Sequence, residues 1–269
     1  MIRLIAIISC FLLIFNFAPL AWGETQSTFP YTEAQIQQGE KIAKKALAAS
    51  EQGNFSQAEA YWDDLVSQFP DNPAVWSNRG NTRLSQNKIE EAIADYNQAI
   101  AIDPHQPDPY LNRGIAYEAA GNYEKAIADY NQVLALTPQD AMAYNNRGNA
   151  EAGQKSWTKA LADYQKAIEL VPNFALARAN EALMEYQIGQ DELALRKFRN
   201  LVLKYPLFPD VRAALTAVLW EQGKQGEAES NWVAAIGMDS RYQDLDWIEH
   251  QRRWPPRMVD ALEKFLKLN

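Results

Sequence analysis

Side chains that could carry out catalysis or bind a metal ion are scarce in this sequence of 269 residues. There is one cysteine, Cys10, and the two histidines, His105 and His250, lie far apart along the chain. A zinc site or a Cys–His pair needs more such residues at closer spacing. The carboxylates show no paired-acid spacing that recurs. The sequence therefore predicts no catalytic residue, no cofactor and no metal site, and it argues against an enzyme.

Asparagine is the polar residue with the most regular spacing. Four asparagines follow one another at intervals of 34 residues: Asn78, Asn112, Asn146 and Asn180. A carboxamide has both a donor and an acceptor, so a row of them could hydrogen-bond a peptide backbone whatever its charge. The alternative is that the four amides are solvated or bond locally. A row of this kind requires structural elements that repeat at the same interval.

Prolines show the same interval and mark out these elements. Pro70, Pro104, Pro138, Pro172 and Pro206 are each separated by 34 residues, without an insertion. Such a period is typical of stacked helical hairpins, and proline ends the second helix of each hairpin because it lacks a backbone N–H. With proline at position 32, the sequence predicts six repeats, over residues 39–72, 73–106, 107–140, 141–174, 175–208 and 209–240.

Other positions of the repeat indicate how its two helices pack. Position 24 is aromatic in all six repeats: Trp62, Tyr96, Tyr130, Tyr164, Phe198 and Trp232. Position 8 is small in all six, as expected where two antiparallel helices cross closely: Ala46, Gly80, Gly114, Gly148, Ala182 and Thr216. Position 15 is a glycine in four repeats, which ends the first helix and permits the turn: Gly53, Gly121, Gly189 and Gly223.

The repeats resemble the tetratricopeptide repeat (TPR) family over residues 39–240. The segments 110–117 (YLNRGIAY) and 126–131 (AIADYN) are close to its consensus, and Ser240 replaces the proline in the last repeat. The resemblance implies an all-α fold, a right-handed α-solenoid of six TPR helical hairpins. It also implies that the chain binds a protein or peptide partner in a concave groove and carries out no chemistry.

The predicted groove lies on the first helix of each repeat. Positions 2, 6, 9 and 13 form a stripe about 200° around the helix from the packing residues, and in the resembled family this stripe lines the groove. The predicted peptide-binding residues are Asn78, Asn81, Leu111, Asn112, Ile115, Met142, Asn146, Asn149, Asn180, Leu183 and Tyr186. Repeats two to five have no basic residue at positions 5 or 6, which argues against a heat-shock chaperone tail as the ligand.

Four pairs of opposite charge occupy positions 7 and 23. The predicted structural ion pairs are Arg79 with Asp95, Arg113 with Asp129, Arg147 with Asp163 and, with the signs reversed, Glu181 with Lys197. The two positions carry opposite charges in all four repeats, even where the signs are exchanged. This pattern predicts that the two side chains meet between the paired helices. The alternative is that the arginines form an acid-binding patch.

The two ends of the chain flank the repeats. Residues 1–23 are predicted to be an export signal, since Arg3 precedes an apolar run and Ala21 and Gly23 suit cleavage. An uncleaved membrane anchor or a lipoprotein at Cys10 are the alternatives. Residues 24–38 are predicted to form a lead-in helix capped by Thr32. Residues 241–269 are predicted to form a helical cap over the open end of repeat six, or alternatively a docking element.

The net charge of the chain and the sequence of its C-terminal segment indicate what it binds and where it is located. The net charge of −8 argues against nucleic acid, and membrane contact is expected only through a partner or an uncleaved signal. Segments between residues 246 and 265 look similar to tails of lumenal TPR proteins of cyanobacteria and plastids, which implies the thylakoid lumen or the periplasm. We expect an exported scaffold that supports the assembly or stability of a membrane protein complex. The alternative is a regulatory subunit that docks to an exported enzyme. The oligomeric state stays open.

Overall fold

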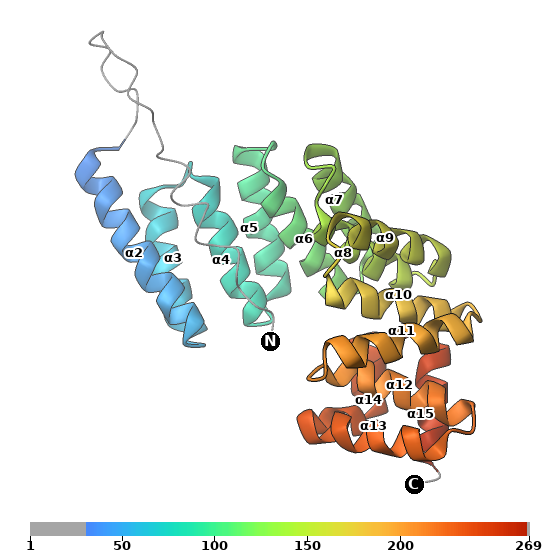
Figure 1. Cartoon of the computed structure of the whole chain (residues 1–269). Coiled ribbons are helices and arrows are strands. Elements are labelled where there is room, and N and C mark those ends of the chain that lie inside the picture. Colours follow the sequence, from blue (N-terminus) through green and yellow to red (C-terminus); the bar gives the residue numbers. More distant parts are fainter. Residues whose placement is uncertain (1–30, 268–269) are drawn as a thin grey trace. The chain divides into compact units, whose positions relative to one another are not determined.

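The computed structural model describes residues 31–267, which contain helices and no strand (Figure 1). The all-α prediction is confirmed. The chain divides into two compact units, an N-terminal unit up to Ala120 and a C-terminal unit from Gly121. The repeat helices are α2 (Glu33–Glu51), α3 (Phe55–Gln68), α4 (Pro73–Ser85), α5 (Ile89–Ile102), α6 (Pro107–Ala119), α7 (Tyr123–Leu136), α8 (Ala141–Gly153), α9 (Trp157–Leu170), α10 (Ala175–Gln187), α11 (Asp191–Lys204), α12 (Pro209–Glu221) and α13 (Gln225–Met238).

The helix boundaries follow the 34-residue period. The first helices of repeats two to six begin at the first residue of each predicted repeat: Pro73, Pro107, Ala141, Ala175 and Pro209. Each second helix from α3 to α11 ends two residues before a periodic proline. The carbonyl oxygens of some of these prolines accept a hydrogen bond from the side chain at position 4 of the next repeat. Trp76 Nε1 donates to Pro70 O at 2.8 Å, and Arg178 Nε donates to Pro172 O at 2.7 Å. The prolines thus end one repeat and help to orient the next.

The turn at position 15 has the same backbone conformation in every repeat. The four glycines there have φ between 71° and 87°. Asn87 and Lys155 occupy position 15 in repeats two and four, and both have a φ of 61°. The turn therefore requires a residue in the left-handed backbone conformation at position 15. Asparagine tolerates this conformation better than most residues other than glycine.

Position 8 is small because a ring from position 24 lies against it. A Cβ atom on Gly80 would lie 2.7 Å from Tyr96 Cε1, and one on Gly148 would lie 2.7 Å from Tyr164 Cε1. Both tyrosine rings are buried. The close approach of the paired helices in repeats two and four therefore depends on the absence of a side chain at this position.

The first helix begins earlier than the sequence predicts. Thr32 is its N-cap as expected, since Thr32 Oγ1 accepts from Gln35 N and Gln35 Oε1 accepts from Thr32 N. From there α2 continues without a break to Glu51, so the described part of the predicted lead-in helix is about the first two turns of the first repeat helix. Gly39 does not end it, because this residue is buried inside the helix against Phe69.

The predicted export signal and Cys10 lie outside the described residues. Between residues 31 and 267, no helix has both the length and the apolar character that crossing a bilayer would need.

The C-terminal segment folds back over the first helices instead of extending the stack. It consists of η1 (Ser240–Gln243), α14 (Leu245–Trp247), η2 (Ile248–Arg252) and α15 (Pro256–Leu266), and α15 packs against α12 and α10. The Phe265 ring lies 5.2 Å from the ring of Trp220 and 5.4 Å from that of Trp232. The predicted helical cap thus packs on repeat six, but α15 lies chiefly against the first helices α12 and α10 and reaches α13 only at Trp232.

Candidate functional site

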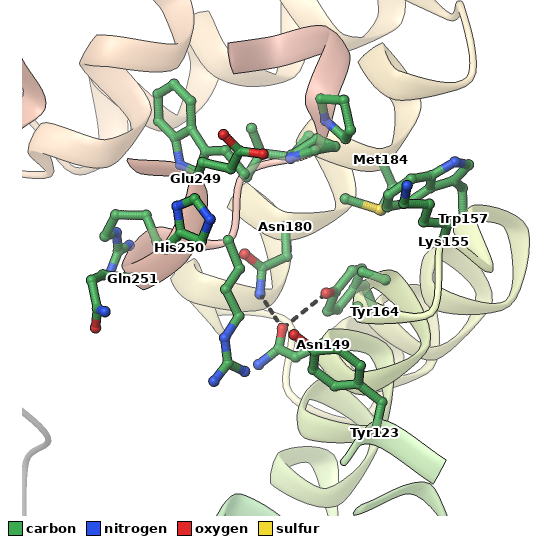
Figure 2. A pocket seen from close by; sticks show the side chains of 18 of the residues that line it. Tyr123, Asn149, Lys155, Trp157, Tyr164, Asn180, Met184, Glu249, His250 and Gln251 are labelled. Atoms are coloured by element: carbon green, nitrogen blue, oxygen red, sulfur yellow. Dashed lines mark hydrogen bonds between the residues drawn. The ribbon is translucent and has the colours of Figure 1, made fainter. Parts of the chain in front are cut away.

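The predicted groove stripe of repeats four and five lines a hollow in the C-terminal unit (Figure 2). The hollow has a volume of about 420 Å³, and positions 2, 6 and 9 contribute Leu176, Asn180, Asn149 and Leu183. Residues 249–256 of the C-terminal segment line it as well. Tyr123, Trp157 and Met184 add apolar surface around the two amides, while Lys155 and the polar side chains of residues 249–253 make the rest of the lining polar. We call this feature the amide hollow.

A hydrogen-bond network joins the amides across the two repeats. Asn149 Oδ1 accepts from Tyr164 OH at 2.8 Å and from Asn180 Nδ2 at 3.2 Å (Figure 2). Asn180 Nδ2 also donates to Asn145 Oδ1 at 3.3 Å, and Asn145 Nδ2 donates to Asn146 Oδ1 at 3.2 Å. Asn145 is buried and was not among the predicted groove residues, because position 5 is an asparagine in repeat four alone.

The network fixes which amide groups are left for a ligand. Asn149 accepts through Oδ1 in both of its bonds, so its Nδ2 keeps two N–H donors. Asn180 donates through Nδ2 in both of its bonds, so its Oδ1 remains an acceptor. Within residues 31–267 neither of these atoms has another partner, and both residues line the hollow. A peptide group presents the complementary acceptor and donor.

Three predicted groove residues are not available in this structure. Asn146 is buried and bonded to Asn145, so it supports the network rather than facing a partner. Leu183 and Tyr186 are also buried. The Arg257 guanidinium lies 4.2 Å above the Tyr186 ring and also donates to the Tyr186 carbonyl. The chain's own tail therefore covers the groove at the end of repeat five, which corrects the prediction of an open surface there.

The N-terminal unit holds the other part of the predicted groove. Asn81 Oδ1 accepts from Tyr96 OH at 2.8 Å, so it satisfies a buried hydroxyl. Asn78 lies on a small recess together with Leu47 and Trp62. On α6 the predicted residues are half-buried: Leu111, Asn112 and Ile115. Their role in binding stays a prediction.

In repeats two, four and five, the residue type at position 9 depends on whether position 24 of the same repeat carries a hydroxyl group. Asn81 with Tyr96, and Asn149 with Tyr164, form the same hydrogen bond in repeats two and four, at 2.8 Å in each case. In repeat five, position 9 is Leu183 and position 24 is Phe198, which has no hydroxyl. This correspondence was visible in the sequence and would have identified Asn81 and Asn149 as partners of the tyrosines.

Replacing Asn81 by leucine is expected to destabilise the N-terminal unit by about 1 to 3 kcal/mol, because the buried Tyr96 hydroxyl loses its acceptor. Adding Tyr96→Phe should restore most of this loss, since the pair then equals the Leu183 and Phe198 pair. Urea unfolding of the single and double variants measures the coupling free energy between Asn81 and Tyr96. A double variant as unstable as Asn81→Leu would contradict the assignment.

Three of the four predicted ion pairs are present. Arg79 Nη2 lies 2.7 Å from Asp95 Oδ1, Arg147 Nη2 lies 2.7 Å from Asp163 Oδ1, and Lys197 Nζ lies 2.7 Å from Glu181 Oε1. The arginines of the first two pairs bind bidentately through Nε as well. Arg113 and Asp129 belong to different units, so their pairing stays a prediction.

The arginines at position 7 also bind the preceding repeat. Arg79 Nη1 donates to Asp63 at 2.8 Å, Arg113 Nη1 to Asn97 at 2.6 Å and Arg147 Nη1 to Asn131 at 2.7 Å. Each acceptor is at position 25 of a second helix. These arginines are thus occupied within the array, which argues against the acid-binding patch.

A second set of contacts, centred on Glu59, joins repeat one to repeat two. Glu59 accepts from Arg83 at 2.9 Å, Gln86 at 2.8 Å and Lys88 at 2.6 Å. Burial alone raises the pKa of the Glu59 carboxyl, but the hydrogen bonds from Lys88, Arg83 and Gln86 outweigh it and lower this pKa to about 2. Glu59 therefore stays ionised and joins repeat one, which lacks the ion pair of positions 7 and 23, to repeat two.

Asp210 holds the tail against repeat six. It is buried at position 2 of α12 and accepts from Tyr242 OH at 2.7 Å, from Arg252 Nη2 at 2.6 Å and from Trp254 Nε1 at 3.1 Å. Burial opposes the charge on Arg252, yet the attraction of Asp210 raises the pKa of this guanidinium above its usual value. Farther along, Arg257 Nη2 donates to Asp191 Oδ2 at 2.7 Å. These contacts fix the wall of the amide hollow.

Metal-binding clusters are absent from the part of the chain that the structure describes. His250 lines the amide hollow, but its Nδ1 lies 3.0 Å from the carbonyl oxygen of Asp246 in its own helical turn. His105 is exposed in an inter-repeat turn.

Comparison with known proteins identifies the repeats. One family model, described as TPR repeat, matches residues 80–121, and two described as tetratricopeptide repeat match 111–175 and 44–72. No curated protein matches the sequence. The TPR prediction is thereby confirmed between residues 44 and 175.

Solved structures share the fold at low sequence identity. A chain of the crystal structure of the APC/C hetero-tetramer Cut9–Hcn1 has a TM-score of 0.68 at 16% identity and covers 85% of this chain and 43% of its own. This chain thus spans less than half of that protein. A tetratricopeptide repeat protein from Parabacteroides merdae has a TM-score of 0.62 at 22% identity, over 86% of this chain and 98% of its own. YrrB, a TPR protein with an unusual peptide-binding site, has a TM-score of 0.53 at 19% identity, over 71% and 97%.

Proposed function

We propose that this tetratricopeptide repeat protein is a binding scaffold that captures an extended segment of a partner protein at the amide hollow. The observation that carries the proposal is the pair formed by the Asn149 Nδ2 donor and the Asn180 Oδ1 acceptor in one hollow. An extended backbone has free N–H and C=O groups to match this pair, whereas a helix satisfies its own. An extended ligand is therefore favoured over a helix.

Exposed apolar side chains on the predicted groove stripe provide the second part of the recognition. Met142 and Leu176 occupy position 2 of neighbouring repeats and are 47% and 38% exposed. Large apolar residues with this exposure beside directed polar groups are typical of a binding surface. The bound segment is thus expected to place an apolar side chain near Leu176 while its backbone meets the amides. YrrB, which shares the fold, is a TPR protein with an unusual peptide-binding site, and this supports a peptide-binding function here.

The location of the protein is part of the proposal. The leader-like residues 1–23 support export, and the tail segments support the thylakoid lumen or the periplasm. In such a compartment, a scaffold that holds an extended segment would act in the assembly or stability of a membrane protein complex.

The proposal is tested with a peptide selected from a random display library against the whole chain. Fluorescence anisotropy then compares affinities for variants of the hollow. Asn149→Asp keeps an oxygen acceptor for Tyr164 and Asn180 but removes the N–H donors, so the Kd should rise about tenfold or more. Leu176→Asp should have a similar effect, because it places a charge on the apolar surface.

Leu203→Asp is the matched control, since Leu203 is 82% exposed on α11 and outside the hollow. It should leave the Kd unchanged. Equal affinities for Asn149→Asp, Leu176→Asp and the unmodified chain would refute a ligand site in the hollow.

A further inference from the structure

The last repeat helix leaves much of its surface uncovered. Each of the helices α3, α5, α7, α9 and α11 buries four residues, whereas α13 buries only Ala228 and Ala235. Val233 on α13 is 66% exposed and Met238 is 37% exposed. The tail contacts α13 through η1 and through the Phe265 ring against Trp232, but it leaves Val233 uncovered.

Equivalent positions in earlier repeats identify what this side of α13 would contact. Position 25 of the second helix meets the first helix of the next repeat, as shown by Asp63 with Arg79 and Asn131 with Arg147. On α13, position 25 is Val233. The exposed side of α13 is therefore the surface on which another helix packs elsewhere in the array.

The chemistry of this surface also differs from that of the inner repeats. Position 25 is polar in the other five repeats: Asp63, Asn97, Asn131, Gln165 and Arg199. From Val233 to Met238 every residue of α13 is non-polar. An apolar run at the uncovered end of a stack is suited to an apolar partner helix rather than to water.

We infer that a second copy of this chain covers α13, with the two α13 helices packed antiparallel about a twofold axis near Val233. The contact continues the helix packing that joins successive repeats within the chain. The only charges on α13 are Glu227 and Glu229, which lie in its N-terminal half. An antiparallel pair separates these carboxylates of the two copies, whereas a parallel pair would bring like charges together.

A head-to-tail contact with α2 of the second copy fits less well. Position 7, which meets the preceding repeat elsewhere, is the exposed Lys45 on α2, with Lys44 beside it. Packing Val233 and Met238 against these lysines would remove charges from water without a partner at each of them. The isologous contact has no such cost.

The size of the contact predicts its strength. A helix of 14 residues is about 21 Å long, so one helix pair covers less than the roughly 800 Å² per partner of a standard interface. The dimer is therefore expected to be weak and to dissociate on dilution.

Sedimentation velocity of the whole chain, from about 1 to about 200 µM, tests the inference. The expected result is a monomer that becomes a dimer as concentration rises. Val233→Glu should keep the chain monomeric over this range, because the twofold axis brings the two new carboxylates together. Leu207→Glu is the control, since Leu207 is 84% exposed but lies outside α13, and it should dimerise normally.

A cysteine at the axis provides an independent measurement. In a Cys10→Ser background, Val233→Cys should form a disulfide-linked dimer under mild oxidation, and Leu207→Cys should not. A chain that stays monomeric at every concentration overturns the inference. So does a dimer that persists in Val233→Glu, or one that is lost equally in Leu207→Glu.

Discussion

Replacing Asp210 by alanine is expected to lower the free energy of unfolding of the C-terminal unit by about 3 to 5 kcal/mol. The carboxylate accepts hydrogen bonds from Tyr242, Arg252 and Trp254 and is itself buried. Without it, a mostly buried guanidinium loses its counter-charge, and two further buried donors lose their acceptor. Such groups cannot regain water unless the segment that carries them leaves the first helices.

The tail should therefore open before the rest of the C-terminal unit. Hydrogen exchange at the backbone amides of α15 is expected to become faster in Asp210→Ala while α8 and α9 remain protected. Denaturant unfolding followed by tryptophan fluorescence measures the overall loss. Asp260→Ala is the control, because Asp260 lies on the exposed side of α15 and should leave stability nearly unchanged. A loss below about 1 kcal/mol for Asp210→Ala would mean that the tail is held by its apolar contacts alone.

Release of the tail has a consequence for the proposed binding site. Residues 249–256 form a wall of the amide hollow, and Leu183 and Tyr186 are buried in the folded state. If ligand binding uses this wall, Asp210→Ala should weaken peptide capture even though Asn149 and Asn180 are unchanged. The same variant would expose additional groove surface, so peptides of a different, more apolar class should then be selected.

The repeat architecture could be predicted from the sequence because each of its features has a local cause. Proline cannot continue a helix, so the prolines after α3 to α11 set the boundaries. The left-handed turn at position 15 favours glycine, and Asn87 and Lys155 show that the conformation is required even where glycine is absent. The small residue at position 8 was correctly attributed to close packing, although the contact in repeats two and four is with the aromatic ring at position 24 rather than with a crossing backbone.

The candidate site was predicted less completely, because the direction of an amide depends on neighbours outside the period. Asn146 and Asn180 occupy the same position in adjacent repeats. Asn146 is buried and accepts a hydrogen bond from Asn145, whereas Asn180 lines the hollow. Asparagine at position 5 occurs only in repeat four, so a search for recurring residues could not find it. The periodic pattern gives the face of the helix but not the partner of each side chain.

The position of the tail could not be predicted for a related reason. Its contacts join residues far apart in the sequence, such as Arg252 with Asp210 and Arg257 with Asp191. None of these residues belongs to a repeating pattern that relates them. The amphipathic character of α15 indicated correctly that it packs on the array, but two apolar surfaces were available. The buried carboxylate of Asp210 on α12 favours the first helices over the end of α13.

Reversing the charge of Arg147 alone, by Arg147→Asp, is expected to destabilise the C-terminal unit by about 3 to 5 kcal/mol. Arg147 binds Asp163 through two nitrogens, and the side chains are 24% and 10% exposed, so two carboxylates would face each other with little solvent between them. The hydrogen bond to Asn131 in the preceding repeat would be lost as well. Urea unfolding monitored by circular dichroism measures the change.

Adding Asp163→Arg should recover about half of that loss or more, because the opposite charges are restored in the opposite order. Repeat five already contains this arrangement, with Lys197 Nζ 2.7 Å from Glu181 Oε1 at the same two positions. Recovery should be incomplete, since an arginine on α9 is not placed to reach Asn131. Charge reversal at Lys166 on α9, whose ion pair with Glu169 lies on the surface, is the control and should change stability by less than about 1 kcal/mol. A double variant no more stable than Arg147→Asp would show that the pair depends on its orientation and not on charge alone, and the reversal in repeat five would then need another explanation.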